Sequence, residues 1–398
     1  MAERLDACVA RHQLMLPYAG PPNLVDLARA LAMIAGVGGF EPTPAIAAIQ
    51  KKIGDPEHLV FALADGLAMN VLIRMPENGF LRTHLAMELR STAPSTTATA
   101  LTSLATGCYP GQHAITGWFT HLADLGRTAI ILPFVDRFSG AALEMAGITA
   151  EDAFPKPSLM PRMTRKPIAL LPMQLYNSTY SRYTRGDMPG FGYITLRQMA
   201  EMAIYRAQTA SARTYTFIYL PQVDRLAHDV GPTHERVIDL AAAVERELAR
   251  LADSIAGSGK LVVAADHGQI AVHPEKRFGL YDGDPLLPLL RVPPSGEGRF
   301  PLFHVRPSEH QAFEAMFDDR FGEHFILLNI QEADDLQLFG PTGLDPLARQ
   351  RFGDYLAIPI ADHALEYYVS QQAWERAPLG RHGGLSQDEM RIPLIVAG

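Results

Sequence analysis

Three short apolar runs that each stop at an acidic residue constrain the fold of this chain more than any other feature. They are HLVFALADG at 58–66, TFIYLPQVD at 216–224 and KLVVAADHG at 260–268. Continuous apolar runs of this length are typical of strands that are buried on both faces of a parallel sheet. Such strands present their carboxyl ends, and here their acids, at one edge of the sheet, where α/β proteins bind ligands.

A helical pattern separates the second and third of these runs. Residues 234–256 alternate apolar and charged positions with the period of an amphipathic helix. Strand, helix and strand in this order indicate a βαβ unit of a parallel sheet. With 398 residues and 47% hydrophobic composition, the chain can also bury a large core. We therefore expect a large α/β sandwich with a mostly parallel central sheet, helices on both faces and inserted cap segments.

The remaining segments suggest how the chain is divided. Residues 1–50 are expected to form a helical lead-in, because 24–36 has helical periodicity that ends at a glycine. Residues 51–398 would then form the core. Within it, 120–205 is rich in Pro, Met and Tyr without βα alternation and predicts an inserted cap. Residues 285–350 predict a small α+β insertion.

Composition excludes several functional classes. A net charge of −8 argues against a nucleic-acid scaffold, which needs a basic surface to neutralise phosphates. No run of residues is long and apolar enough to suggest a membrane span. Cys8 and Cys108 are too few for a disulfide framework or a cysteine-based zinc site, so any metal would be held by histidines and carboxylates. The first residues mix charged with apolar side chains, unlike a signal peptide, so a cytoplasmic location is expected.

Acids and histidines gather where the predicted strands end. A glycine loop just before the last apolar run, RHGGLSQDEMRIPLIVAG at 381–398, adds a further histidine. Carboxylate and imidazole are ligands that zinc and manganese accept, and two ions about 4 Å apart can clamp the attacking and leaving oxygens of a phosphoryl transfer. The candidate ligands are Asp65, Asp224, His228, Asp266, His267 and His382.

A cluster of hydroxyl side chains completes the pattern. The segment STAPSTTATALTSLATG at 91–107 predicts a helix of small residues with Ser95, Thr96 and Thr97 at its start. Free backbone N–H groups and the helix dipole favour a bound anion at such a helix start. The cluster is also compatible with a plain N-cap and close helix packing.

Four strings in order along the chain resemble the type I phosphodiesterase and nucleotide pyrophosphatase family of the alkaline phosphatase superfamily. PSTTATALTSLATGCYPGQHAITGW is similar to the nucleophile segment, VDRLAHDVGP to the D-x3-H-x2-GP segment, and AADHG and RHGG to the other metal-ligand segments. The resemblance implies that Thr97 is the nucleophile, with Thr96 as the fallback. It places Asp65, Asp266, His267 and the Thr97 hydroxyl on one metal ion; the other would be held by Asp224, His228 and His382.

The resemblance implies hydrolysis of a phosphodiester or nucleotide pyrophosphate bond of a small substrate through a covalent phosphothreonine. Two divalent ions are expected, zinc first and manganese second. The chain has Ala100 at the position matched to a phosphate-holding asparagine and Ala114 in place of a glycine, so nucleotide specificity is not implied. Alternatives are a phosphonate hydrolase or a phosphomonoesterase on the same metal core, and a non-catalytic binding protein that retains the fold.

Four of the candidate ligands also have an ordinary structural explanation. Asp65 is followed by glycine and could be a turn residue. Asp266 and His267 could form a hydrogen-bonded pair, and His382 could be a loop histidine beside two turn glycines. The convergence of all of them at one sheet edge favours ligation, because clustered buried acids are unfavourable without a cation. The sequence does not indicate an oligomeric state.

Overall fold

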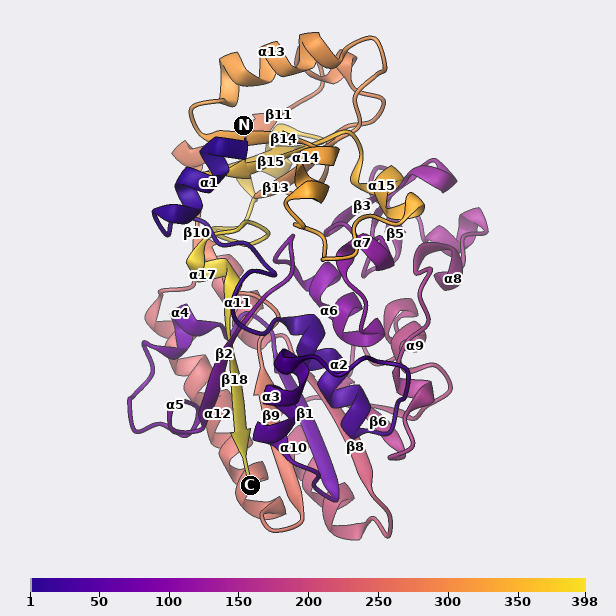
Figure 1. Cartoon of the computed structure of the whole chain (residues 1–398), viewed down its shortest axis with the longest axis vertical. Helices are drawn as coiled ribbons and strands as arrows, with labels where there is room; N and C mark the ends of the chain where they lie inside the picture. The colour runs from indigo at the N-terminus through magenta and orange to yellow at the C-terminus, as the bar shows by residue number, and fades with distance from the viewer. Residues whose placement is uncertain (1) are drawn as a thin grey trace.

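Two sheets of seven strands each organise the computed structural model, which describes residues 2–398 (Figure 1). The central sheet consists, in spatial order, of β2 (Leu85–Arg90), β18 (Arg391–Ala397), β9 (Gly259–Ala264), β1 (His58–Ala64), β8 (Thr214–Leu220), β6 (Pro167–Pro172) and β7 (Gly190–Tyr193). The second sheet consists of β14 (Phe325–Asn329), β15 (Tyr355–Pro359), β13 (Phe300–Phe303), β12 (Ser295–Glu297), β3 (Phe119–Leu122), β4 (Arg127–Ile130) and β5 (Val135–Asp136).

The three apolar runs of the sequence form adjacent parallel strands. β1 lies between β8 and β9 and pairs in parallel with both. β6 pairs in parallel with β8 and β7, whereas β18 runs antiparallel to β2 and β9. Because β18 runs the opposite way, the loop that precedes it lies at the carboxyl edge of β1, β8 and β9. The expected α/β fold with a mostly parallel central sheet is confirmed.

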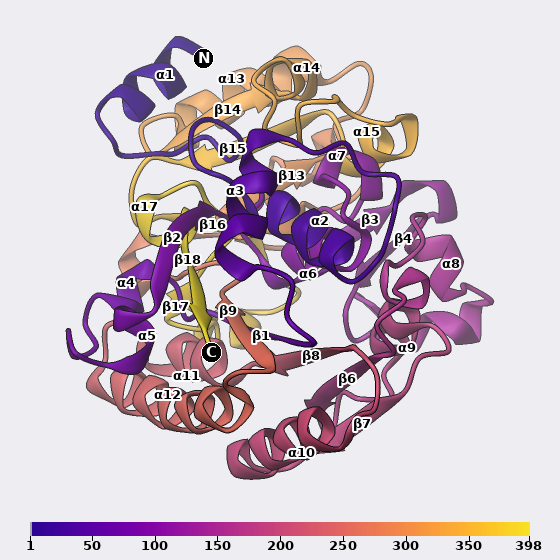
Figure 2. The same cartoon turned by 60° about the horizontal axis from the view of Figure 1, so that its bottom comes forward.

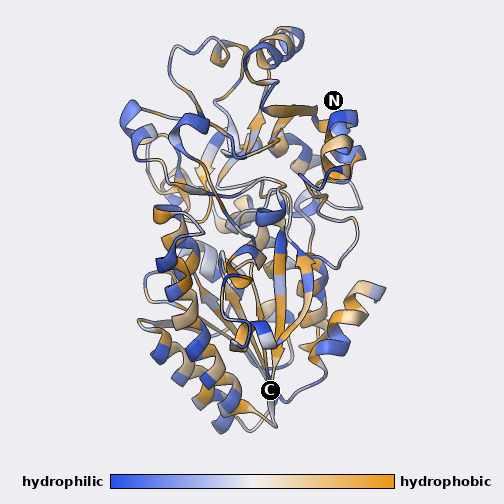
Figure 3. Ribbon diagram, turned by 90° about the vertical axis from the view of Figure 1, so that its left-hand side faces the viewer, coloured by the Kyte–Doolittle hydropathy of each residue, from blue (hydrophilic) through white to orange (hydrophobic). Residues whose placement is uncertain are grey.

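Helices cover both faces of the central sheet (Figure 2). α2 (Leu24–Ile34), α3 (Pro44–Ile53) and α6 (Thr97–Thr106) pack on one face, and α10 (Leu196–Thr209) and α12 (Glu235–Ile255) on the other. Successive side chains of β1 alternate between the two cores, because neighbouring residues of a strand point to opposite faces. The strands are accordingly hydrophobic, while the helices carry mixed hydropathy along their length (Figure 3).

The remaining helices are shorter or lie outside these two layers. They are α1 (Ala2–Ala10), α4 (Met69–Leu72), α5 (Phe80–Thr83), α7 (Pro110–His113), α8 (Ala150–Ala153), α9 (Thr179–Arg185), α11 (Gln222–Val230), α13 (His310–Phe321), α14 (Ile330–Asp335), α15 (Pro346–Phe352), α16 (Gln371–Glu375) and α17 (Gln387–Met390). Two small sheets pair β10 (Ile270–Ala271) with β17 (Gly380–Arg381) and β11 (Arg277–Leu280) with β16 (Ala364–Tyr367). Among residues 2–398, no helix has the length and apolar character needed to cross a bilayer.

The second sheet is antiparallel throughout and joins two distant parts of the chain. β3, β4 and β5 come from the start of the segment 120–205, and they meet β12 through a bridge between Gly296 and Phe119. The end of the same segment instead supplies β6, β7 and α10 to the central sheet. The structure therefore divides 120–205, expected as one cap, between two sheets. Short strands, and prolines at both ends of β6, hid this division in the sequence.

Candidate active site

The carboxyl ends of β1 and β9 place two acids side by side. Asp65 directly follows β1, and Asp266 lies two residues beyond the end of β9. The Gly66 N–H donates to Asp266 Oδ1 at 3.3 Å, and the His267 N–H donates to the same oxygen at 3.0 Å. The His267 side chain lies beside both acids, with Nε2 at 3.6 Å from Asp65 Oδ1 and 3.4 Å from Asp266 Oδ2.

Asp224 and His228 lie on one face of α11, in its first and last turns. The sequence placed Asp224 at the end of a strand, but β8 ends at Leu220 and Pro221 precedes the helix. The spacing of four residues brings His228 Nε2 to 3.4 Å from Asp224 Oδ2. The Nδ1 atom of His228 lies 2.7 Å from the Gly380 carbonyl oxygen, which favours the tautomer with Nε2 free to bind a metal ion.

His382 joins these groups from the loop between β17 and β18. Its ring lies 4.0 Å from the His267 ring and 5.0 Å from the His228 ring, measured between centroids. Two sets of potential ligand atoms each lie within 4.8 Å of one another: Asp65, Asp266 and His267, and Asp224, His267 and His382. The structure thus brings every expected ligand to one edge of the sheet.

The two candidate threonines have different surroundings. Thr97 is the first residue of α6, and its Oγ1 lies 3.0 Å from His267 Nε2. Thr96 caps the same helix and is fully buried, and its hydroxyl donates to Glu297 Oε1 at 2.5 Å. The Thr97 hydroxyl therefore faces the cluster of candidate ligands, whereas the Thr96 hydroxyl is held by a carboxyl group.

Burial and like charge perturb the ionisable groups of the cluster. Burial, followed by the carboxyl groups of Asp224 and Asp266, raises the pKa of Asp65 well above its ordinary value. Burial also raises the pKa of Asp266. Burial and then the neighbouring rings of His267 and His228 lower the pKa of His382 well below its ordinary value. In each case the charged form of the group is disfavoured, because the group is buried away from water and lies beside groups of the same charge.

Several ligand atoms lack a partner that a cation would provide. Within residues 2–398, Asp65 Oδ1, Asp266 Oδ2 and His382 Nδ1 are buried and accept or donate no hydrogen bond. Buried polar atoms without a partner are unfavourable by roughly 1–3 kcal/mol each. Carboxylate and imidazole groups at this density suit divalent zinc or manganese, so the residues present fit a metal centre.

Four residues near the cluster were not singled out from the sequence. The Tyr219 hydroxyl donates to Asp65 Oδ2, and the Gln269 amide donates to Asp224 Oδ1. Glu297, on β12 of the second sheet, accepts from the Trp118 N–H at 2.7 Å, and burial raises its pKa to about 7. Tyr219 lies within a predicted strand and Gln269 directly follows AADHG, so the position of each residue in the sequence already placed it near the candidate ligands. Glu297 and Trp118 reach the site only through tertiary structure.

Ala100, where the resemblance implied an asparagine that holds a phosphate oxygen, does not face the site. Its side chain is fully buried in the hydrophobic core between α6 and the central sheet. An amide at this position would point into that core. The side chain at position 100 therefore makes no contact with a phosphate oxygen in this fold.

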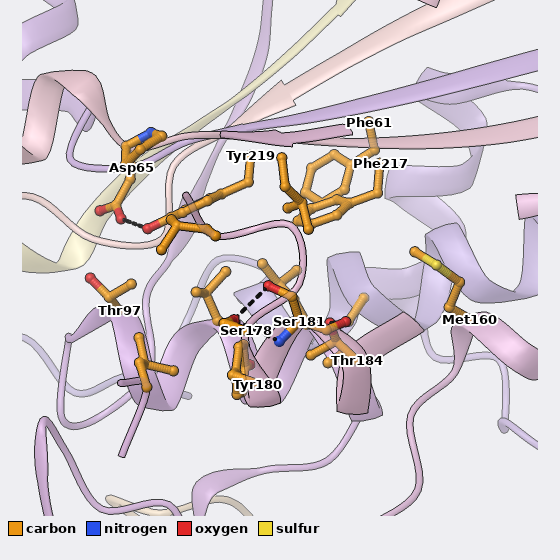
Figure 4. A pocket seen from close by; sticks show the side chains of 18 of the residues that line it. Phe61, Asp65, Thr97, Met160, Ser178, Tyr180, Ser181, Thr184, Phe217 and Tyr219 are labelled. Carbon is orange, nitrogen blue, oxygen red and sulfur yellow. Dashed lines mark hydrogen bonds between the residues drawn. The ribbon is translucent and has the colours of Figure 1, made fainter. Parts of the chain in front are cut away.

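A cavity of about 520 Å³ opens beside the cluster (Figure 4). Asp65, Thr97 and Asp224 line one end of it. In Figure 4, Asp65 and Thr97 lie close together at this end, and the Tyr219 hydroxyl points toward Asp65. The Thr97 hydroxyl can thus meet a small molecule, as a nucleophile must.

Solved structures with low sequence identity share this fold. Murine ectonucleotide pyrophosphatase / phosphodiesterase 5 is 16% identical, with a TM-score of 0.62 over 85% of this chain and 88% of that chain. The human protein of the same name is 12% identical, with a TM-score of 0.63 over 85% and 87%. Phosphonoacetate hydrolase from Sinorhizobium meliloti 1021 is 17% identical, with a TM-score of 0.61 over 86% and 91%. These likenesses show an alkaline-phosphatase-like fold. A comparison with curated proteins gave no match.

The family assignment rests on a match between the sequence and a family model. The model of the type I phosphodiesterase / nucleotide pyrophosphatase family matches residues 63–383, which is most of the chain. The matched range contains the two candidate threonines and every candidate ligand. The chain therefore belongs to the type I phosphodiesterase / nucleotide pyrophosphatase family of phosphoester hydrolases.

Proposed function

We propose that this enzyme hydrolyses phosphodiesters or related phosphorus esters through a covalent phosphothreonine on Thr97, at a centre of two divalent metal ions. The observation that carries the proposal is the Thr97 hydroxyl, which starts α6, lines the cavity and lies 3.0 Å from His267 Nε2. Thr96 is the less suitable nucleophile, because Glu297 holds its hydroxyl.

The proposed ligand sets are those that the family resemblance implies, and the close spacing of Asp65, Asp266 and His267, and of Asp224 and His382, supports them. Asp65, Asp266, His267 and the Thr97 hydroxyl would hold one ion. The other would be held by Asp224, His228 and His382. When bound, the ions would lower the pKa of a coordinated hydroxyl and balance the charge of the phosphate. Zinc is the first choice and manganese the second.

The chain's own groups account for the order of events. Thr97 Oγ1 releases its proton to solvent and attacks phosphorus, the ester bond breaks, and the leaving oxygen takes the electron pair of that bond. The backbone N–H groups at the start of α6 favour the phosphoryl group that Thr97 then carries. Water afterwards cleaves the phosphothreonine and frees the hydroxyl. Tyr219 and Gln269 keep the carboxyl groups of Asp65 and Asp224 in position.

Related structures support a small phosphorus-containing substrate. One is an inactive variant of the murine protein, in which a threonine is replaced by alanine, in complex with AMP. The other is phosphonoacetate hydrolase in complex with phosphonoformate, which makes phosphonate hydrolysis the second candidate activity. The cytoplasmic location expected from the sequence stays a prediction.

Metal analysis together with a bis-p-nitrophenyl phosphate assay tests the proposal. The purified protein should bind about two divalent ions per chain and release p-nitrophenol. Asp266→Ala and His382→Ala should bind fewer ions and lose hydrolysis, whereas His273→Ala, at an exposed histidine, should match the wild type. Full metal occupancy in both ligand variants would contradict the ligand assignment, and a metal-loaded protein inactive on diesters, monoesters and phosphonates would support the non-catalytic alternative.

A further inference from the structure

The cavity beside the candidate active site extends well beyond the space that a phosphate group needs. From Asp65 and Thr97 it runs between β1 and β8 of the central sheet on one side and α9 on the other (Figure 4). Met160 lies at the opposite end from Thr97 in this view. The cavity has a volume of about 520 Å³, which falls within the range of pockets that hold a small organic ligand.

The walls of this extension are apolar. Phe61 and Phe217 form an aromatic wall on the sheet side, with ring centroids 5.9 Å apart. Leucine and methionine side chains form much of the rest of the lining, among them Leu101 of α6 and Met160 and Met163 of the segment before β6. Methionines are flexible and adapt to the shape of an apolar ligand.

The hydroxyl groups of α9 that face the cavity are already paired. Ser178 Oγ donates to Ser181 Oγ at 3.0 Å, and Thr184 Oγ1 donates to the Ser181 carbonyl oxygen at 3.1 Å. These two bonds stay within α9 and its N-cap residue, so the Ser178 and Thr184 hydroxyl groups need no acceptor from a ligand, and the Tyr180 hydroxyl lies 3.3 Å from Thr102 Oγ1 of α6. They add little polarity to the wall.

Charged side chains lie only at the catalytic end of the cavity. Among the described lining residues, the charged ones are Asp65, Asp224 and Arg225, and Arg225 adjoins Asp224 on α11. A nucleoside in the extension would leave several donors and acceptors of its base and ribose without partners, which is unfavourable in an apolar pocket. A hydrocarbon chain has no such groups and gains free energy from burial.

We propose that the cavity receives the unbranched hydrocarbon chain of an amphiphilic phosphate ester, so that the substrate class is a lipid-like phosphoester and not a nucleotide. The inference rests on the proposed function, because the phosphate would then sit at Thr97 with the chain directed toward Met160. The cavity is continuous with the candidate active site, since Thr97 lines both.

A series of p-nitrophenyl phosphodiesters with methyl, butyl and octyl groups tests this inference in the metal-loaded enzyme. Burial of one methylene is worth about fourfold in affinity, so burial of four of the seven additional methylenes should already raise kcat/KM at least about 100-fold from methyl to octyl. Thr184→Phe fills the cavity and should lower the octyl-to-methyl ratio of kcat/KM at least about tenfold. The matched control is Thr179→Phe on the same helix, at a residue that does not line the cavity; it should keep the wild-type ratio.

The outcomes separate this inference from the proposed function. Equal kcat/KM for all three esters, or an unchanged ratio in Thr184→Phe, would overturn the hydrocarbon site while leaving the hydrolase intact. If no ester is hydrolysed, the proposed function fails and calorimetry decides the inference. Octylphosphonate binding at least about tenfold tighter than methylphosphonate would support it, and equal affinities would overturn it.

Discussion

A single hydrogen bond distinguishes the two threonines at the start of α6. Thr96 and Thr97 are neighbours of the same type, yet only Thr97 lines the cavity, because Glu297 Oε1 holds the Thr96 hydroxyl. The same oxygen accepts from the Trp118 N–H. Glu297 thus connects the start of α6 with Trp118, the residue that precedes β3, and holds both segments beside the candidate metal ligands.

Replacing Glu297 tests this positioning role. Glu297→Leu leaves the Thr96 hydroxyl and the Trp118 N–H buried without an acceptor, which should lower the free energy of unfolding by about 1–3 kcal/mol. Misplacement of α6 should also lower kcat/KM. Glu297→Gln retains one carbonyl oxygen as acceptor and should recover most of both quantities. Urea denaturation and steady-state assays measure the two effects, and equal behaviour of the two variants would argue against the role.

A buried ion pair between two strands and a helix fixes the loop that carries His382. Arg299, between β12 and β13, donates to both oxygens of Glu389 at 2.6 and 2.7 Å, and both side chains are fully buried. Glu389 Oε1 also accepts from the Gly384 N–H at 2.8 Å. The second sheet is thereby joined to the turn that follows His382.

Glu389→Ala should destabilise the protein strongly. It leaves the Arg299 guanidinium buried without its partner, which is expected to lower the free energy of unfolding by about 3–5 kcal/mol. The loop should also lose its anchor, so the affinity for the ion assigned to His382 should fall. Glu323→Ala, at an exposed glutamate, is the matched control and should change stability by no more than about 0.5 kcal/mol. Denaturation and metal titration of both variants measure the difference; equal stability would show that the pair contributes little.

Buried ionisable groups make the free energy of unfolding depend on pH. Burial lowers the pKa of His113 to about 3. Its Nδ1 accepts from the Ile115 N–H at 3.1 Å, and its Nε2 lies 2.9 Å from Ser103 Oγ, so the ring is neutral in the fold. The Arg299 guanidinium opposes burial and holds the pKa of Glu389 below its usual value.

These shifts predict loss of stability on acidification. Between about pH 6.5 and 3 the unfolded state binds a proton at His113 that the folded state does not, so stability falls as pH falls. Glu389 adds a loss that begins near its unfolded pKa of about 4.3 and continues as pH falls through its folded value. His113→Asn should reduce the slope of unfolding free energy between pH 6 and 5 by up to about 1.4 kcal/mol per pH unit. Denaturation curves at both pH values measure it, and identical slopes would contradict the assignment.

The sequence predicted the fold and the candidate site unequally. The buried strands and their terminal acids were readable because apolar runs and their stops are local signals. The sequence run TFIYLPQVD predicts one strand that ends at Asp224. In the structure the strand ends before Pro221 and a helix begins at Gln222, a change that the apolar pattern of the run does not mark. The sequence predicted a small α+β insertion at 285–350, but it did not show that the strands of this insertion pair with β3, β4 and β5, because these strands are short and lie far apart in the chain. Glu297 was missed for the same reason.

Detection of a covalent phosphothreonine is the decisive test of Thr97 as the nucleophile. Acid quenching of the metal-loaded enzyme during turnover of bis-p-nitrophenyl phosphate, followed by mass spectrometry of its peptides, should find the phosphoryl adduct on Thr97. Thr97→Ala should lose most of the turnover rate while keeping most of its metal, Thr97→Ser should retain more activity than the alanine variant, and Thr96→Ala should stay active. An adduct on Thr96, or full activity in Thr97→Ala, would contradict the claim.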